Sequence, residues 1–489
     1  MLEAFFQLPT IKTYDQVFSF DQTDNHSVII YLVDQLNEQL FQSTEALKKI
    51  AVRFEKDQKK SFMTQLPNEI GTYLIILAKD TPFNLMTELK NKLVKIKPLH
   101  GELSLINTTN DVNFESYALR TILANDFKMP NYQSKKNPSE NNKKLNNIHI
   151  YSTNNKDYIK KTKANHLGNG IARFLAMMPI SHLRPKNYYE ILEKLSEKYH
   201  WQFKAYTYEE LKKMGAGAFC AVGRASPDQA FIFHLKYKPK IQSKLKLSLV
   251  GKGICFDTGG VSLKAPQYMY NMHEDMQGSS VALGNLVAIT EKELPIEVDL
   301  FLAVTENLIG ENAFLPNEVV TTLKGISVET TDTDAEGRMV LADTLYLASK
   351  EKPQILIDFA TLTGAAVRAI STRYSVLVSN QKTWLNDLIH IGDISAERAW
   401  PMPLFGDDFS DVLHSDIADI KQCLVTGNAD HLMAAYYLYK FIDDQIKWIH
   451  LDLAASTNEG GLGAIPSTYT GFGVWWSQYF IDHLLKEKI

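Results

Sequence analysis

The chain has 489 residues, of which 45% are apolar and 22% charged, so a large buried core is possible and disorder along the whole chain is excluded. Domains of about 100–200 residues would divide this length into two or three domains. Lysine and arginine number 52 against 56 aspartates and glutamates, and the resulting net charge of −4 disfavours a dedicated nucleic-acid binder.

The three cysteines, Cys220, Cys255 and Cys423, cannot build a disulfide framework, which favours a reducing, intracellular compartment. No stretch approaches the about 18 consecutive apolar residues of a membrane span. The first residues lack the basic start of a signal peptide. We therefore expect a soluble, cytoplasmic protein that does not cross a membrane.

The first part of the chain has short apolar runs, at 27–32 and 71–78, between helix-like mixed segments. This texture predicts a small N-terminal α/β domain over residues 1–170. From 131 to 166 the composition shifts to Lys, Asn and Ser, which predicts a solvated surface segment or linker. The same basic run, over 135–163, leaves DNA binding as an alternative function.

Beyond residue 170, segments typical of strands alternate with segments typical of helices. Strands are expected at 245–250, 298–305, 354–360 and 448–453, and helices at 271–290, 337–349 and 429–442. This alternation predicts a larger domain over 171–489, α/β in class, with a doubly wound, mostly parallel central sheet flanked by helices. Sites in such sheets form at the carboxyl ends of the strands.

Ionisable residues occur where these strands are expected to end. They are Lys252, Asp257 and Lys264 in one glycine-rich loop, Asp275 at the start of the next helix, and Asp334, Glu336 and Arg338 before a later helix. Since Asp334 and Glu336 are two positions apart, an extended backbone would direct both carboxylates to the same side.

Simpler catalytic motifs fail one by one. The Asp-Thr-Gly triplet at 257–259 lacks the second triplet that an aspartic protease needs, and no G-x-S-x-G sequence is present. The His-Glu pair at 273–274 is followed by Gln277, where a zinc-binding H-E-x-x-H motif needs histidine. The remaining acidic cluster, with its two lysines and one arginine, is either a solvated surface or an oxygen-rich site for two bridged cations.

Several sequence blocks surround these residues. They read VGKGICFDTGGVSLK at 250–264, DTDAEGRM at 332–339, DFATLTGAA at 358–366, SDIADIK at 415–421 and HLDLAA at 450–455. In order and spacing, the blocks resemble the leucyl aminopeptidase (cytosol aminopeptidase) family of dizinc exopeptidases, over residues 171–489. Asp332 and Met339 replace the Asn and Leu of the family's signature N-T-D-A-E-G-R-L, and residues 178–182 depart from the family's N-T-P-x-N.

The resemblance implies a site for two divalent metal ions, with zinc expected and manganese or cobalt also compatible with the ligands. It implies that Lys252, Asp257, Asp275 and Glu336 hold one ion, and that Asp257, Asp334 and Glu336 hold the other. Lys264 and Arg338 would be the catalytic residues, with a bicarbonate on Arg338 as general base.

The function implied is a metalloaminopeptidase that hydrolyses N-terminal residues, preferably leucine and other apolar residues, from peptides. The first side chain of the substrate is expected against Met272, Thr361 and Gly364, with Ala454 near the pocket wall. The resemblance also implies a homohexamer. Some family members are thought to bind DNA as well. An inactive homologue is disfavoured, because every expected ligand position is filled.

Overall fold

The computed structural model of the protein describes residues 7–15, 28–33, 61–65, 72–77, 80–96, 99–109, 111–127, 144–227, 229–404, 406, 411–425 and 429–487. The chain divides into two compact units. The first comprises Met1–His166 with Glu459–Thr468, and the second comprises Leu167–Asn458 with Tyr469–Ile489. The predicted boundary after residue 170 falls inside helix α5 (Tyr158–Ala176).

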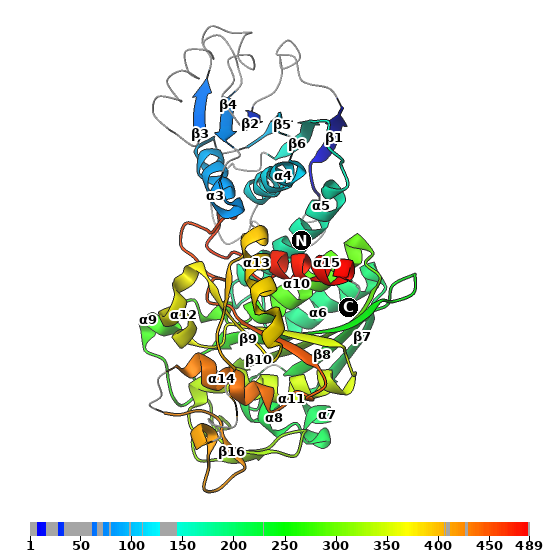
Figure 1. Ribbon diagram of the computed structural model, residues 1–489. Helices are drawn as coiled ribbons and strands as arrows, with labels where there is room; N and C mark the ends of the chain where they lie inside the picture. Colours follow the sequence, from blue (N-terminus) through cyan, green and yellow to red (C-terminus); the bar gives the residue numbers. More distant parts are fainter. Residues whose placement is uncertain are drawn as a thin grey trace. The chain divides into compact units, whose positions relative to one another are not determined.

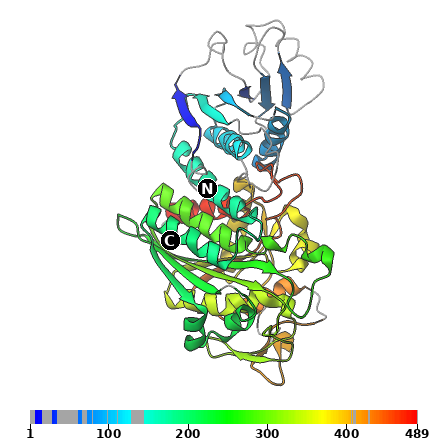
Figure 2. The same cartoon turned by 180° about the vertical axis from the view of Figure 1, so that it is seen from behind.

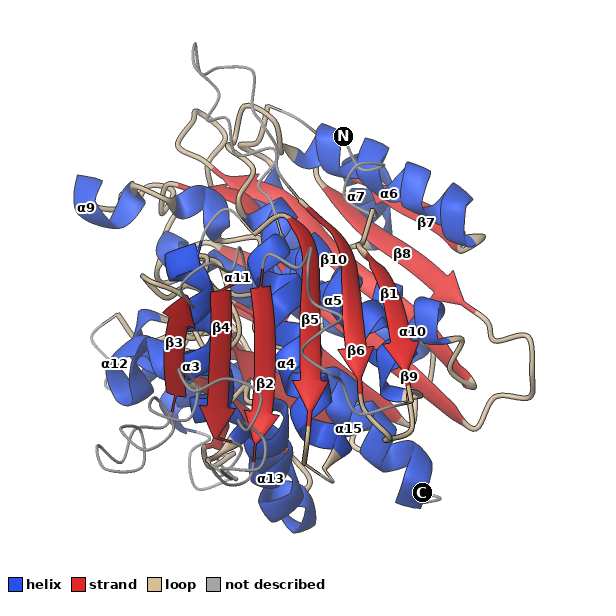
Figure 3. Cartoon of the chain, turned by 90° about the horizontal axis from the view of Figure 1, so that it is seen from above, coloured by secondary structure: helices blue, strands red, loops and turns tan. Residues whose placement is uncertain are grey.

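The first unit contains a six-stranded sheet with the order β1-β6-β5-β2-β4-β3. Its strands are β1 (Thr10–Tyr14), β2 (Val28–Val33), β3 (Ser61–Gln65), β4 (Thr72–Leu77), β5 (Gly101–Asn107) and β6 (Leu145–Tyr151). Only β3 and β4 pair antiparallel in this sheet. Figure 3 displays the six strands side by side, with helices α3 (Pro82–Leu93) and α4 (Val112–Asp126) packed against them. The strands expected at 27–32 and 71–78 are therefore confirmed over the described residues 28–33 and 72–77.

The Lys/Asn-rich stretch is not a solvated linker throughout, and this prediction is wrong for its second half. Residues Leu145–Tyr151 form β6, which pairs with β1 and β5. Ile148 and Ile150 of this strand are fully buried. Helix α5 begins shortly afterwards, at Tyr158. Residues 131–143 of the stretch lie outside the described residues.

The second unit is built on an eight-stranded sheet with the order β15-β14-β17-β13-β9-β10-β8-β7. Its strands are β7 (Gln202–Thr207), β8 (Phe231–Tyr237), β9 (Leu245–Asp257), β10 (Ile296–Asn307), β13 (Ile355–Ala360), β14 (Ser375–Ser379), β15 (Ala399–Pro401) and β17 (Lys447–Asp452). The central strands β17, β13, β9 and β10 run parallel. Antiparallel pairs flank them on both sides. The expected α/β class with a parallel-rich central sheet is confirmed.

Helices cover both faces of this sheet (Figures 1 and 2). On one face lie α6 (Pro185–Tyr199), α10 (Gln277–Lys292), α13 (Leu385–Ser395) and α15 (Val474–Glu487), and on the other lie α8 (Gly217–Gly223), α11 (Glu336–Lys350) and α14 (Asp430–Tyr439). No helix in the described part of the chain combines the length and apolar character needed to cross a bilayer.

Smaller elements complete the second unit. They are helices α7 (Tyr208–Met214), α9 (Pro266–Met269) and α12 (Gly364–Ile370), the 3₁₀ turns η4 (Met272–Glu274), η5 (Thr333–Ala335), η6 (Ser371–Arg373) and η7 (Lys382–Trp384), and the small sheet of β11 (Val319–Thr321), β12 (Ser327–Glu329) and β16 (Ile420–Lys421). In the first unit, η3 (Val94–Ile96) extends α3.

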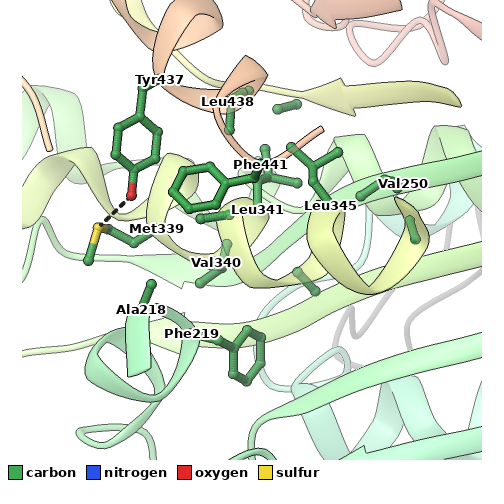
Figure 4. Packing of buried hydrophobic residues seen from close by; sticks show 14 of the residues in the cluster. Ala218, Phe219, Val250, Met339, Val340, Leu341, Leu345, Tyr437, Leu438 and Phe441 are labelled. Carbon is green, nitrogen blue, oxygen red and sulfur yellow. Dashed lines mark hydrogen bonds between the residues drawn. The ribbon is translucent and has the colours of Figure 1, made fainter. Parts of the chain in front are cut away.

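Helix α11 is fixed by a buried apolar cluster (Figure 4). Leu345 of α11, Phe219 of α8 and Phe441 after α14 are all fully buried. The Tyr437 hydroxyl also contacts Met339 Sδ, at 3.5 Å. Because this packing holds the first turn of α11, it fixes the position of the ionisable residues that begin the helix.

Candidate metal centre

Strand β9 carries two of the predicted ligands. It extends to Asp257, so Lys252 and Asp257 lie in a central strand, and the prediction of a loop from residue 251 is wrong. Pairing with β10 continues along this part of the strand, which is why it stays extended. Lys252 is 2% exposed. Its side chain passes so close to α11 that a Cβ at Gly337 would lie 2.7 Å from Lys252 Nζ.

Lys252 links Asp275 and Glu336. Its ammonium lies 2.8 Å from both carboxylate oxygens of Asp275 and 2.9 Å from Glu336 Oε1, and it donates to the Thr361 carbonyl at 3.0 Å. Asp275 follows the 3₁₀ turn η4, and α10 begins only at Gln277. The predicted helix from residue 271 is therefore wrong at its start, because Asn271 adopts a left-handed backbone with φ of 74°.

Asp257 and Asp334 share a second lysine. Lys264 Nζ lies 2.9 Å from Asp257 Oδ2 and 2.5 Å from Asp334 Oδ1. The turn that returns Lys264 to the site passes through Gly259, whose φ is 86° and whose N–H donates to Asp257 Oδ1 at 2.8 Å. A Cβ at Gly259 would lie 2.5 Å from the Ser262 carbonyl, so this turn requires glycine.

Asp334 and Glu336 are brought together by a helix start, and the prediction of an extended backbone is wrong. Asp334 lies in the 3₁₀ turn η5, which Asp332 caps by accepting the Asp334 N–H at 3.0 Å, and Glu336 is the first residue of α11. One carboxylate oxygen from each of Asp257, Asp334 and Glu336 lies within 4.8 Å of the others. Three carboxylates this close form a candidate cation site.

Burial and mutual repulsion dominate the electrostatics of this cluster. Burial, followed by repulsion from Asp257 and Glu336, raises the pKa of Asp334 to about 7. Burial likewise raises the pKa of Asp275 and of Glu336. Burial alone lowers the pKa of Lys252, but the carboxylates of Asp275 and Glu336 raise it above its ordinary value. Four carboxylates, and an amine that would lose its proton on metal binding, are a donor set that fits two divalent cations.

Arg338 is also buried, at 2% exposed, and its ion-pair partner is Asp430 rather than one of the four carboxylates named above. Its Nη2 donates to Asp430 Oδ2 at 2.7 Å and its Nη1 to the Gln422 carbonyl at 3.3 Å. Within the described part of the chain, its buried Nε–H has no hydrogen-bond partner. No local pattern indicates the pairing with Asp430, because the two residues are 92 positions apart.

A cavity of about 720 Å³ connects these groups. Its lining includes all of the residues predicted for the substrate, namely Met272, Thr361, Gly364 and Ala454, together with Lys252, Asp257, Lys264, Asp275, Asp334, Glu336 and Arg338. The lining also includes Glu274, Gln277 and Thr457, to which sequence analysis assigned no role. Burial raises the pKa of Glu274, against the hydroxyls of Thr457 and Tyr469, which lower it.

A second acid and histidine group lies elsewhere on the sheet. His234, Asp299 and Glu351 approach one another there. Lys236 Nζ lies 3.0 Å from both Asp299 and Glu351, and Lys246 Nζ contacts the same two acids at 3.3 and 3.5 Å. Because two lysines here balance two carboxylates, whereas in the cavity two lysines face four, this group is an ion-pair network rather than a cation site.

The second unit is therefore an α/β protein with a carboxylate-rich cavity at the carboxyl ends of parallel strands. Residues 170–476 match the model of the cytosol aminopeptidase family, catalytic domain, and the chain belongs to this family. The recognition from the sequence blocks is confirmed. None of the comparisons supports the DNA-binding alternative.

Relatives carry the same family name. A "probable cytosol aminopeptidase" of Rickettsia rickettsii is 38% identical over 275 residues, which are 56% of this chain and 55% of that protein. The protein of the same name from Chlorobaculum tepidum is 36% identical over 304 residues, which are 62% of this chain and 60% of that protein. The protein of the same name from Phytoplasma australiense is 31% identical over 403 residues, which are 81% of this chain and 79% of that protein. The chain thus spans little more than half the length of the first two relatives.

A solved structure has the same fold. The apo structure of leucyl aminopeptidase from Trypanosoma cruzi superposes with a TM-score of 0.82 over 98% of both chains, at 21% sequence identity. At that identity the match establishes the fold.

Proposed function

We propose that this chain is a metal-dependent aminopeptidase that hydrolyses the first peptide bond of peptides and releases their N-terminal residues. The observation that carries this proposal is the approach of Asp257, Asp334 and Glu336 within 4.8 Å beside the cavity. The family membership and the names of the relatives support the activity. A cytoplasmic location and a homohexamer stay predictions drawn from the resemblance.

Two divalent ions, with zinc preferred and manganese or cobalt as alternatives, would occupy the carboxylate cluster. One would be held by Lys252, Asp257, Asp275 and Glu336, and the other by Asp257, Asp334 and Glu336. When bound, such ions would act as Lewis acids and lower the pKa of water, so that the hydroxide able to attack a carbonyl forms at neutral pH. Lys252 must then release its proton to donate a lone pair, which repulsion by two dications favours.

Lys264 would stabilise negative charge that develops on the carbonyl oxygen of the substrate. Burial lowers the pKa of Lys264, but Asp257 and Glu336 raise it above its ordinary value, so the side chain stays an ammonium. A fixed positive charge in a cavity shielded from water stabilises an oxyanion without reorganisation.

Arg338 would hold the bicarbonate that the resemblance implies. The Nε–H of Arg338 is available to an anion, but Asp430 already accepts from Nη2 at 2.7 Å. Bicarbonate would therefore share the guanidinium with Asp430. If it binds, bicarbonate would be held by the guanidinium and would take the proton released in hydrolysis.

The first side chain of the substrate would lie against Met272, Thr361, Gly364 and Ala454. Because this wall is largely apolar, leucine and other apolar residues should bind better than glycine, by about 0.8 kcal/mol for each buried methylene. Acidic side chains should bind worst, since they would be buried without a cation partner.

Metal content and hydrolysis of a panel of aminoacyl-amides, measured on the same samples, test the proposal. Asp257→Ala and Glu336→Ala should lose bound metal and activity together while circular dichroism stays unchanged, because each residue would serve both ions. Asp416→Ala is the control, since the Asp416 side chain is 92% exposed. Either variant with two bound metals and full activity would contradict the assignment.

A further inference from the structure

Glu274 is a carboxylate in the wall of the cavity that has no part in the proposed metal binding. It ends the 3₁₀ turn η4, two residues after Met272, and both residues line the cavity. The left-handed backbone of Asn271 begins this turn. The same turn that brings Asp275 to Lys252 therefore also brings Glu274 to the cavity.

The Glu274 carboxylate is held by neutral groups alone. Its Oε2 accepts from Thr457 Oγ1 at 3.2 Å, and Gln277 Nε2 donates to the same Thr457 hydroxyl at 3.0 Å. The Tyr469 hydroxyl also hydrogen-bonds to Glu274. Among the described residues, no lysine, arginine or histidine forms an ion pair with Glu274.

The other carboxylates of the cavity are compensated differently. Lys252 pairs with Asp275 and Glu336, Lys264 with Asp257 and Asp334, and Arg338 with Asp430. Asp332 and Asp452 accept hydrogen bonds from backbone N–H groups. Glu274 is left as a partly buried negative charge that faces the cavity without a cation, which is costly unless a bound molecule supplies one.

The position of Glu274 relates it to the first residue of a substrate. Two of the residues expected around that side chain are close in sequence to this carboxylate and its partner. Met272 lies two positions before Glu274, and Ala454 lies three positions before Thr457. Another of these residues, Thr361, donates from its hydroxyl to Asp275 Oδ1 at 2.8 Å, and Asp275 directly follows Glu274. The carboxylate and the apolar residues thus line the same cavity.

We propose that Glu274 is a specificity-determining residue that binds the cationic end of a lysine or arginine at the N-terminus of the substrate. This inference rests on the proposed aminopeptidase function. The methylene stem of such a side chain would lie along Met272 and Ala454, and its charged end would pair with Glu274. Leucine would still be accepted by the apolar wall, but it would leave the Glu274 charge unpaired.

The test compares kcat/KM for lysine amide and norleucine amide on the metal-loaded enzyme. The two substrates share a four-carbon stem, and only lysine carries an ammonium. Lysine amide should be cleaved about tenfold to a hundredfold better, the range expected for a charge-assisted contact in a specificity pocket. This ratio is measured on the unmodified protein and so does not depend on whether a variant folds.

Glu274→Gln removes the charge and keeps the hydrogen-bonding shape. It should lower the lysine-to-norleucine ratio at least about tenfold, through loss of lysine cleavage. Glu311→Gln, at an exposed glutamate outside the cavity, is the control and should change neither rate. An unchanged ratio in Glu274→Gln, or an equal loss for both substrates, would overturn the inference. Failure of the unmodified protein to cleave either amide would instead contradict the proposed function.

Discussion

The Lys264 ammonium lies 2.9 Å from Asp257 and 2.5 Å from Asp334, beside the predicted ligands of one ion. Because its charge would act on the oxyanion rather than on the bound substrate, Lys264→Ala should lower kcat about 10²–10³-fold with a small change in KM. Steady-state kinetics on leucine amide measure this, and Lys240→Ala, at a side chain 92% exposed, is the control. A variant altered only in KM would contradict the role of Lys264.

At the scale of single residues, sequence reasoning predicted the cluster because family blocks carry the ligand positions in a fixed order. It did not predict Asp430 as the partner of Arg338 or Thr457 as the partner of Glu274. Each pair joins residues from distant parts of the chain, 92 and 183 positions apart, and no local pattern encodes such a pairing.

At the scale of elements, the close approach of α11 to β9 depends on Gly337. A Cβ there would lie 2.7 Å from both Cε and Nζ of Lys252, so Gly337→Ala should displace the amine from Asp275 and Glu336. Alanine stabilises a helix by up to about 1 kcal/mol over glycine, so the free energy of unfolding should hold while metal affinity falls at least about tenfold. Isothermal titration with zinc and chemical denaturation measure the two quantities.

The control for Gly337→Ala is Gly392→Ala in α13, where the nearest non-neighbouring atom would lie 3.1 Å away and no cavity residue is involved. It should leave metal affinity unchanged. Equal affinities for Gly337→Ala and the unmodified protein would show that Lys252 can adjust, and would contradict the tight packing inferred for this helix.

Asp343 ties α11 to two other segments. Its carboxylate accepts the N–H of Phe219, in α8, at 2.9 Å and the N–H of Leu323 at 2.7 Å, and the residue is fully buried. Burial raises its pKa from 3.8 to about 7, against these hydrogen bonds. The folded state thus holds the proton more tightly than the unfolded state does, so this contribution to stability is complete below about pH 4 and is lost as the pH rises to about 7.

Raising the pH from 4 to 7 should therefore destabilise the unmodified protein relative to Asp343→Asn, by at most about 4 kcal/mol in the free energy of unfolding. Urea denaturation at a series of pH values measures it. Asp387→Asn, at an exposed residue of α13, is the control. A difference that is constant over this range, or that shifts the other way, would contradict the raised pKa.

Sequence analysis predicted strands correctly where the apolar runs are long. Strands β9, β10, β13 and β17 were expected, because buried parallel strands read as continuous apolar segments. The edge strands β15 and β7 were not expected, since β15 has three residues and β7 is only partly buried. The 3₁₀ turn η4 was mistaken for a helix, because the left-handed backbone of Asn271 leaves no sign in the sequence pattern.

At the scale of the whole molecule, the change in texture along the sequence predicted two parts but not their exact composition. The segment Glu459–Thr468 belongs to the first unit, although it lies between two parts of the second. Lys90 Nζ donates to the Gly460 carbonyl at 3.1 Å, a contact between residues 370 positions apart. Tertiary packing determines that this late segment belongs to the first unit, and neither composition nor periodicity predicts such packing.

Each unit has its own sheet, and every residue that lines the cavity belongs to the second unit. We therefore expect two thermal transitions, of which added zinc or manganese raises only that of the second unit. Metal at about 100 times its dissociation constant adds about 2.7 kcal/mol to the folded state. For a unit of this size that is a rise of about 5 °C in Tm.

Differential scanning calorimetry with and without metal measures both transitions, and Asp257→Ala identifies the one that depends on the carboxylate cluster. In that variant the metal-induced rise should vanish, and the other transition should keep its temperature in both proteins. The expectation follows from linkage, because a ligand stabilises only the cooperative unit that contains its site. If both transitions rose together with metal, the two units would unfold as one cooperative body, and the division of the chain would hold for its contacts but not for its energetics.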